Sequence, residues 1–545
     1  MLAVLACLWS TEVHGQSPGT GAAPVTYTDV TAQSGIRFTH NLGDDEMSSI
    51  LEATGSGCLF FDYDGDGWID LYAVNGCALE GISRPRAGHT PADEADHLFR
   101  NEGNGTFTDV TVASGTGDPG YGMAAVGGDY DNDGHQDIYV TNYGRNTLYH
   151  NLGNGRFADV TVAAGVGDSL WGAGATFLDY DRDGDLDLYV GNYLDFDPEY
   201  HLSYAGDGHP GPLSYPGQPD VFYRNNGDGT FSDATRAAGV QDDEGRAMGV
   251  VAGDPTGDGW PDIFVANDAM ANFLYRNNGN GTFTDIALES GTAFAQDGNA
   301  AGSMGGDLGD YDNDGDLDLF VPDMGYSNLF QNQRSSYFDN QSAVAGISVP
   351  SGPYVSWHGD LLDYDNDGWL DLFISNGNAH YLTHTEESLL LTNVPGPAGT
   401  RVFEDVSGRA GAWFRTRGVA RGAAAADYDN DGDLDLFVVN LDQPSVLLRN
   451  DGGNDRHWLQ VALRGTVSNR DGVGAWVTVH ADGRRMLEER LTAAGYLSQS
   501  DPRLHFGLGS GGLVDSVTVR WPSGQLQTLT EVAVDQVLVV EEPAR

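Results

Sequence analysis

A nine-residue acidic loop occurs seven times in this 545-residue chain. Each copy places oxygen-bearing side chains at positions 1, 3, 5 and 9 and glycine at position 6. Carboxylates packed this closely repel one another, so a folded chain that contains them needs a cation between them. Oxygen ligands from a tight loop are typical of Ca²⁺. In chain order, loops one to seven begin at Asp62, Asp129, Asp179, Asp254, Asp310, Asp363 and Asp427.

The loop geometry predicts the ligands. Positions 1, 3 and 5 of a tight turn can converge on one point, and glycine at position 6 permits the sharp bend. The carbonyl of position 7 and the aspartate at position 9 complete the shell. The predicted metal-binding residues are Asp62, Asp64, Asp66, Trp68, Asp70; Asp129, Asp131, Asp133, His135, Asp137; Asp179, Asp181, Asp183, Asp185, Asp187; Asp254, Thr256, Asp258, Trp260, Asp262; Asp310, Asp312, Asp314, Asp316, Asp318; Asp363, Asp365, Asp367, Trp369, Asp371; and Asp427, Asp429, Asp431, Asp433, Asp435.

The loops differ from an EF-hand, which needs glutamate at position 12 and a helix on each side. Position 12 is apolar in every copy, and the residues that follow each loop read as β-strands. We therefore predict about seven calcium sites, each joining two strands. A solvated acidic turn without metal is the alternative. It is strongest for loop four, where Pro255 and Thr256 weaken the site.

The loops belong to a longer repeat, as in propellers and solenoids. Each is followed by a third apolar strand, and six are followed by a fourth that begins with an aromatic residue. The missing seventh fourth strand stands at the N-terminus, as Tyr27-Thr-Asp29-Val-Thr. A strand from one terminus that completes the last sheet closes a ring without open edges. We predict an all-β fold with a seven-bladed β-propeller over residues 25–452; an open solenoid is the alternative.

The pattern changes after Asn450. Residues 457–542 contain alternating strands and no acidic loop, which predicts a separate β-sandwich-like domain over 453–545. Three short motifs stand out in it: Asn469-Arg-Asp-Gly-Val-Gly-Ala475, Gly495-Tyr-Leu-Ser-Gln-Ser500 and Trp521-Pro-Ser-Gly524.

These motifs carry a resemblance. The seven loops resemble the FG-GAP/VCBS repeats of integrin-α-type propellers, and the C-terminal motifs resemble the ASPIC/UnbV domain. The combination is similar to the cartilage acidic protein family and its bacterial relatives. The resemblance implies calcium binding and an extracellular binding, adhesion or assembly role, with a protein or glycan as partner. Similar propellers carry lyases, so an extracellular enzyme acting on a polysaccharide or secondary metabolite is one alternative. A filament-forming subunit is another.

The strongly negative net charge of the chain limits the kinds of partner that it can bind. The chain carries 27 basic and 80 acidic residues, a formal net charge of −53. Such a protein should repel nucleic acid and anionic membranes. Residues 1–24 are expected to be a leader for secretion or for export to the periplasm, with lipid attachment at Cys7 as a variant of that reading. No later stretch is apolar and long enough to span a membrane.

A few residues outside the acidic loops are also candidates for a disulfide, a metal site or catalysis. Cys58 and Cys77 flank loop one on neighbouring strands, which suggests a disulfide, with free buried thiols as the alternative. Two insertions, residues 195–220 and 376–384, contain histidines. A transition-metal site built from His358, His380 and His384 is a minor alternative to loop packing. Three C-terminal residues of catalytic type are expected to be structural, so no catalytic residue is predicted: Arg470, Ser498 and His505.

Overall fold

The computed structural model describes residues 25–84, 94–205, 208–334 and 337–544. The expected leader and Cys7 lie outside these residues. Among the described residues, no helix combines the length and apolarity needed to cross a bilayer. The helices are short: α1 (Thr31–Ser34), α2 (Ile50–Thr54), α3 (Thr111–Ser114), α4 (Thr161–Ala164), α5 (Pro198–Ser203), α6 (Thr235–Ala238), α7 (Ala287–Ser290) and α8 (Ser348–Ser351), with 3₁₀ turns η1 (Pro212–Ser214), η2 (Pro397–Gly399), η3 (Ser407–Arg409), η4 (Trp413–Arg415) and η5 (Gly453–Asp455).

Six blades are antiparallel sheets whose strands follow one another in the chain. β18 (Ala301–Gly302) adds to the fourth through β15. The blades are β2 (Cys58–Phe61), β3 (Asp70–Ala73), β4 (His97–Asn101), β5 (Phe107–Asp109); β6 (Tyr121–Gly128), β7 (Asp137–Tyr143), β8 (Thr147–Asn151), β9 (Phe157–Asp159); β10 (Gly172–Leu178), β11 (Asp187–Asn192), β12 (Val221–Asn225), β13 (Phe231–Asp233); β14 (Ala247–Gly253), β15 (Asp262–Met270), β16 (Phe273–Asn277), β17 (Phe283–Asp285); β19 (Asp307–Gly309), β20 (Asp318–Val321), β21 (Asn328–Asn332), β22 (Phe338–Asn340); and β23 (Ser356–Leu362), β24 (Asp371–Asn376), β25 (Leu389–Pro395), β26 (Arg401–Asp405).

The seventh blade closes the ring. It combines β27 (Ala420–Ala426), β28 (Asp435–Asn440) and β29 (Val446–Asp451) with the N-terminal strand β1 (Thr26–Asp29). Tyr27 lies opposite Asn450 in this pairing, and its hydroxyl donates to the Leu434 carbonyl at 3.0 Å. The predicted closing strand is therefore confirmed, and the open solenoid is excluded.

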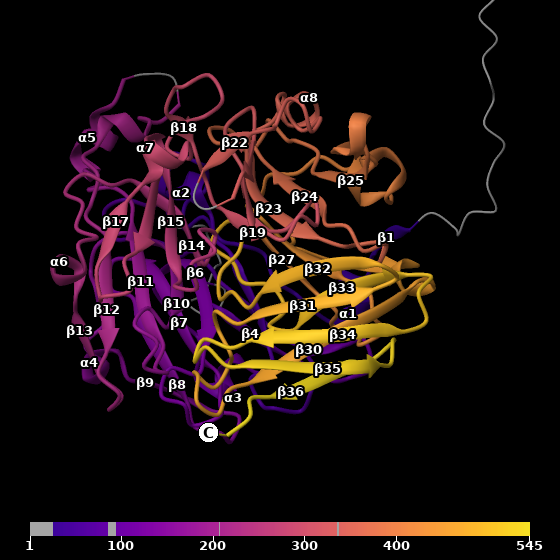
Figure 1. The fold of residues 1–545 in the computed structure, drawn as a ribbon. Coiled ribbons are helices and arrows are strands. Elements are labelled where there is room, and N and C mark those ends of the chain that lie inside the picture. Colours follow the sequence, from indigo (N-terminus) through magenta and orange to yellow (C-terminus); the bar gives the residue numbers. More distant parts are fainter. Residues whose placement is uncertain (1–24, 85–93, 206–207, 335–336, 545) are drawn as a thin grey trace, which may run out of the picture.

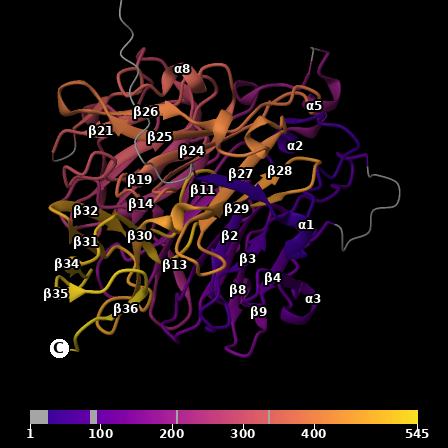
Figure 2. The ribbon, with the colours of Figure 1, turned by 90° about the vertical axis from the view of Figure 1, so that its right-hand side faces the viewer.

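The C-terminal strands form two further sheets. Their apolar faces share one buried cluster that includes Val477, Phe506 and Trp521. In Figures 1 and 2 these strands, coloured yellow, gather at one end of the wheel, away from α5 and α8. One sheet contains β33 (Leu504–Gly509), β30 (His457–Arg464) and β36 (Val537–Glu541); the other contains β32 (Arg484–Glu489), β31 (Trp476–Ala481), β34 (Val514–Arg520) and β35 (Leu526–Val532).

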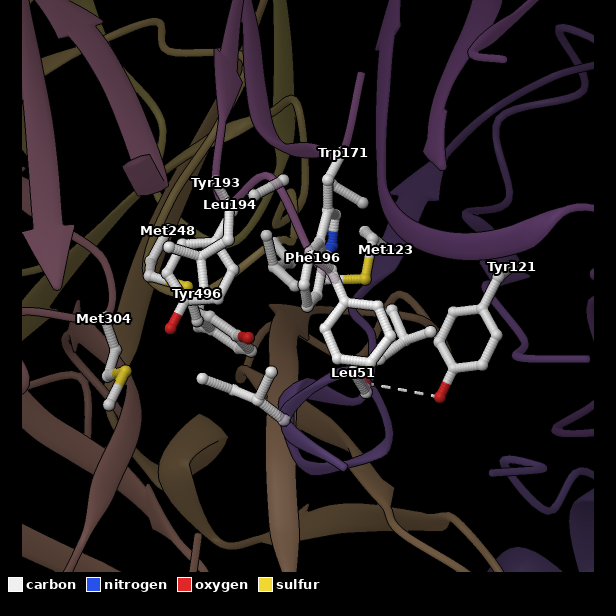
Figure 3. Close-up of a cluster of buried hydrophobic side chains, with 14 of the residues drawn as sticks. Leu51, Tyr121, Met123, Trp171, Tyr193, Leu194, Phe196, Met248, Met304 and Tyr496 are labelled. Carbon is white, nitrogen blue, oxygen red and sulfur yellow. Dashed lines mark hydrogen bonds between the residues drawn. The ribbon is translucent and has the colours of Figure 1, made fainter. Parts of the chain in front are cut away.

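The chain itself fills the centre of the wheel. From one end, α2 enters, and the Arg421 guanidinium donates to its Ala53 carbonyl at 2.8 Å. A second segment, residues 491–501, enters from the other end and is called the channel segment. Figure 3 shows Tyr496 of this segment and Leu51 of α2 among the side chains of the buried central cluster. The channel segment and α2 are in direct contact, because the Tyr496 hydroxyl donates to the Thr54 carbonyl at 3.0 Å.

The channel segment hydrogen-bonds to the inner strands of six blades. Two glycines make room for it: a Cβ at Gly57 would lie 1.8 Å from the Leu497 carbonyl oxygen, and one at Gly305 would lie 2.0 Å from that of Gly495. The channel segment therefore occupies the centre of the ring and contacts most of the blades. The contacts are Gln499 N to Cys58 O (3.0 Å), Gly127 N to Gln499 Oε1 (2.8 Å), Phe177 N to Thr492 Oγ1 (3.0 Å), Gly495 N to Gly306 O (2.9 Å), Tyr496 N to His358 Nδ1 (3.0 Å) and Asp501 N to Ala425 O (2.8 Å).

The expected disulfide is wrong, because Cys58 and Cys77 are both free and buried. The reason is strand register. Cys58 lies opposite Ala73, at the end of β3, so Cys77 falls four residues beyond the pairing. The two thiols consequently belong to different apolar clusters, Cys58 between the first and last blades and Cys77 in the central cluster.

Candidate metal centres

All seven acidic loops lie at the same end of the wheel. Each joins the first and second strands of its blade, and in an up-and-down blade this connection always falls at one end. Carboxylates in several loops come close enough to share an ion. The possible ligand atoms of Asp62, Asp64 and Asp66 lie within 4.8 Å of one another, as do those of Asp179, Asp181 and Asp187 and of Asp310, Asp312 and Asp318.

The aspartate at position 1 organises each loop. In loop one, both Asp62 oxygens accept backbone N–H groups: Oδ1 from Gly65 and Asp66, and Oδ2 from Gly67 at 2.9 Å. Asp66 at position 5 then accepts from the backbone of Trp68 at 2.9 Å. The bonds from position 6 to position 1 and from position 7 to position 5 recur in all seven loops. The sequence pattern therefore folds each loop around its first carboxylate.

An asparagine on the third strand of each blade holds position 9, a role not predicted from the sequence. The Asn101 N–H donates to Asp70 Oδ1 at 2.7 Å, and its side-chain amide donates to the Tyr428 carbonyl of the preceding blade, also at 2.7 Å. The signal was the recurrence of asparagine at the end of every third strand. The seven are Asn101, Asn151, Asn225, Asn277, Asn332, Asn393 and Asn450.

These asparagines link the loops to one another around the ring. In every case the side-chain amide reaches the carbonyl of position 2 in the loop of the neighbouring blade. An event that reorders one loop therefore acts on the adjacent blade through a direct hydrogen bond. Loop two has one further partner, because His150 Nδ1 lies 3.2 Å from Asp137 and 3.4 Å from Asp131.

Burial and mutual repulsion strongly perturb the loop carboxyls. Burial, with the nearby Asp64, raises the pKa of Asp70 to about 9. Burial together with Asp471 raises the pKa of Asp129 to about 8, and burial together with Asp312 does the same for Asp310. A carboxyl with such a pKa is held in a site that disfavours its negative charge unless positive charge is present.

The loops also contain oxygens that accept no hydrogen bond from any residue the structure describes. Asp371 Oδ2 and Asp433 Oδ1 are buried and accept no hydrogen bond, although their residues are almost fully enclosed. Unpartnered buried polar atoms are rare, and a bound ion or water is one explanation for them. Hard oxygen donors, a negative site and spare lone pairs match the preference of Ca²⁺. In loops one, two, three and five, predicted residues lie close enough together to hold such an ion.

The histidines and the serine singled out in the sequence make contacts that stabilise the fold. The His209 and His380 rings lie 4.8 Å apart, which joins the two insertions. Both nitrogens of His209 face backbone carbonyls, Pro210 O at 3.2 Å and Ala379 O at 3.1 Å. His358 is buried in the channel, where it accepts from Tyr496 N. Ser498 donates to the Tyr496 carbonyl, and His505 Nε2 lies 2.6 Å from Asn366 Oδ1.

Without calcium, the protein should be more stable near pH 5 than near pH 8. Raised carboxyl pKa values mean that the folded state binds more protons than the unfolded chain between about pH 4 and pH 8, so its stability falls as pH rises through this window. Saturating calcium should reverse the trend, because deprotonated carboxylates bind the ion. Melting curves at several pH values, with chelator and with calcium, measure both slopes. Parallel pH profiles in the two conditions would contradict the assignment.

Comparison with known families agrees with the motifs. A family model described as FG-GAP-like repeat matches residues 62–140, 129–190, 204–265, 254–321 and 310–374, which together exceed half of the chain. A second model, ASPIC and UnbV, matches residues 465–545. Both families were indicated by the sequence motifs, and both are confirmed.

Curated and solved relatives are more distant. Cartilage acidic protein 1 of Homo sapiens is 26% identical over 319 residues, which cover 56% of this chain and 45% of that protein. The chain thus spans less than half the length of this relative. A structure of YCF48 bound to a D1 peptide is 8% identical and covers 80% of this chain and 99% of its own, with a TM-score of 0.41. The exotype rhamnogalacturonan lyase YesX is 15% identical and covers 73% and 61%, with a TM-score of 0.35.

Proposed function

Because the chain belongs to the FG-GAP-like repeat proteins and ends in an ASPIC and UnbV domain, we propose that it is a secreted, calcium-stabilised propeller that serves as a binding or adhesion module. The observation that carries this proposal is the ring of acidic loops at one end of the blades, several of which bring their carboxylates close enough to share an ion. The loops would hold calcium through positions 1, 3, 5, 7 and 9. Bound calcium would supply the positive charge that the buried carboxyls lack.

Calcium has a structural role in this proposal. The position 1 and position 9 aspartates are tied to the backbone of their own blade, and the linking asparagines tie that blade to its neighbour. An ion bound in a loop would therefore strengthen the contact with the neighbouring blade as well as the hairpin itself. Metal binding of this kind adds directly to the free energy of folding.

The ligand surface is proposed to be the opposite end of the wheel. The loop end is contacted by the C-terminal domain, and the channel is filled by residues 491–501. At the free end, the insertions after the second strands of the third and sixth blades meet through His209 and His380. Tyr200 and Tyr381 are each about 40% exposed there. Tyrosines with one apolar face and a polar hydroxyl suit protein and glycan ligands.

A glycan array and a protein capture experiment test this proposal. The full chain, with calcium, would be presented to glycans and to proteins of its native surroundings. A Tyr200→Ala/Tyr381→Ala variant should lose at least tenfold in affinity for any specific ligand. The control is Tyr337→Ala, a tyrosine that is 55% exposed on the turn between the third and fourth strands of blade five, at the other end. Binding that resists both substitutions would place the ligand elsewhere.

Disabling one calcium site should reduce the stability of the folded protein far less than removing all calcium. Asp312→Ala deletes position 3 of loop five, so we expect the loss of one ion and about 2–3 kcal/mol, the contribution of a site at roughly 100 times its dissociation constant. The other loops should keep their ions. Metal analysis and a melting curve measure the two effects. Asp339→Ala, at an exposed carboxylate on the same blade, is the control and should change stability by under about 0.5 kcal/mol.

A further inference from the structure

Loop four departs from the other six in its chemistry. Thr256 replaces the position 3 aspartate and Pro255 replaces the aromatic residue at position 2. Three carboxylates remain, those of Asp254, Asp258 and Asp262. The frame of the loop is nevertheless intact, because Gly259 N donates to Asp254 Oδ2 and Asn277 N donates to Asp262 Oδ1, both at 2.8 Å. The backbone of a cation site is present with a reduced set of ligands.

A guanidinium from the C-terminal domain contacts the central carboxylate of this loop. Arg520 Nη2 donates to Asp254 Oδ2 at 2.8 Å, and Asp254 is only 2% exposed. Glu489 of the same domain accepts from the Asp254 N–H at 2.8 Å. The position 1 carboxylate is the one around which every loop is folded. In loop four that carboxylate already has a cation from the chain itself.

The strand register of the C-terminal sheet aims Arg520. Trp476 on β31 lies directly opposite Arg520 on β34, and on its other side it lies opposite Glu489 on β32. The Arg520 guanidinium carbon lies 4.2 Å from the centre of the Trp476 ring, a cation–π distance. Three neighbouring side chains in one row of the sheet therefore hold the guanidinium at the mouth of loop four.

A second guanidinium approaches from loop three. In four loops position 4 is an asparagine whose amide donates to the position 6 carbonyl of the next loop. At the junction of loops three and four this residue is Arg182, with its guanidinium 4.2 Å from the centre of the Trp260 ring. A Cβ placed on Gly259 would meet both Arg182 and Arg520 within 3.3 Å. Two positive charges thus flank three carboxylates.

Loop six is the informative comparison. It also has an arginine, and Arg456 pairs with Asp365 at 2.6 Å. That pairing is at position 3, however, and four carboxylates remain in the loop. The hydrogen bonds to Asp363 at position 1 come from the backbone of its own loop, at 3.0 Å from Asp367 and 2.7 Å from Gly368. An arginine near a loop is therefore distinct from an arginine bound to its central carboxylate.

We propose that loop four binds the guanidinium of Arg520 in place of calcium, and that this contact sets the orientation of the C-terminal domain on the ring. The inference rests on the proposed calcium role of the other loops. A domain that docks on seven nearly equivalent loops needs one loop that differs from the rest, or several rotated dockings would compete. Loop four is that loop, and Arg520 recognises it.

Calcium counting by metal analysis and native mass spectrometry tests the proposal. The wild-type chain should hold about six ions, one for each remaining loop. Asp254→Asn should leave that number unchanged, whereas Asp310→Asn, the same substitution at position 1 of loop five, should lower it by one. Thr256→Asp/Arg520→Gln should gain one ion. Circular dichroism of each variant confirms that it is folded.

The outcomes separate this proposal from the broader one. Seven ions in the wild-type chain, or the loss of an ion in Asp254→Asn, would overturn the assignment of loop four and leave the calcium role of the other loops intact. A wild-type chain with no calcium would overturn the proposed function itself. Arg520→Lys should keep the wild-type count, because the positive charge at Asp254 is retained; a gain of one ion in that variant would show that the guanidinium fork is required.

Discussion

Chelating calcium at neutral pH should lower the melting temperature of this protein by roughly 15–20 °C. Each site at about 100 times its dissociation constant contributes about 2.7 kcal/mol to the folded state, so about six sites contribute roughly 16 kcal/mol. That sum exceeds the typical net stability of a folded domain, about 5–15 kcal/mol. With an unfolding entropy of about 2.1 cal/mol/K per residue, it corresponds to the stated shift for a propeller of this size.

Differential scanning calorimetry with chelator, and again after calcium is restored, makes the measurement. Sodium chloride is the necessary control. Simple repulsion among exposed carboxylates is screened by salt, whereas buried charges are screened much less. Since Asp70, Asp318 and Asp435 are almost fully buried, molar sodium chloride should recover only a small part of the loss. Full recovery by sodium chloride, or melting curves unchanged by chelator, would contradict specific calcium sites.

The blade count and the ring closure could be predicted because both are local signals in the chain. Each acidic loop marks its own hairpin, and Tyr27-Thr-Asp29 repeats the aromatic-x-Asp spacing of five of the six other fourth strands. Both depend on residues a short distance apart. The position 1 and position 9 aspartates are likewise read directly from the repeat, since each also accepts a backbone N–H group of its own turn.

The missed features depend on contacts between distant parts of the chain. The linking asparagines contact the previous blade, and the Asn101 bond to Tyr428 spans 327 residues. The C-terminal domain reads as an independent module because its strands alternate normally, yet the segment between β32 and β33 enters the channel. The cysteine prediction failed for a smaller reason: the register of β2 and β3 places Ala73, rather than Cys77, opposite Cys58.

The channel segment should be essential to stability, and Tyr496→Ala should destabilise the protein by about 3–5 kcal/mol, the usual loss for a buried aromatic residue. Tyr496 has no exposed surface and packs edge-on against Trp357, with ring centres 5.1 Å apart. Its hydroxyl is the direct bond between the channel segment and α2. The same unfolding entropy as above converts the loss into a fall of about 3–6 °C.

Two variants separate the parts of this effect. Tyr496→Phe keeps the ring and removes only the donor to Thr54, so it should cost about 1 kcal/mol. Gly305→Ala leaves Tyr496 in place but would bring a Cβ to 2.0 Å from the Gly495 carbonyl oxygen, so it should also destabilise the folded state, by about 1–3 kcal/mol.

Neither change touches an acidic loop, and the number of bound calcium ions should stay at the wild-type value. If Tyr496→Ala and Gly305→Ala both melt at the wild-type temperature, the channel segment does not bind the blades together. If either variant loses calcium, the segment and the loops are a single cooperative unit, because the inner strands that contact the segment are the strands that lead into the loops.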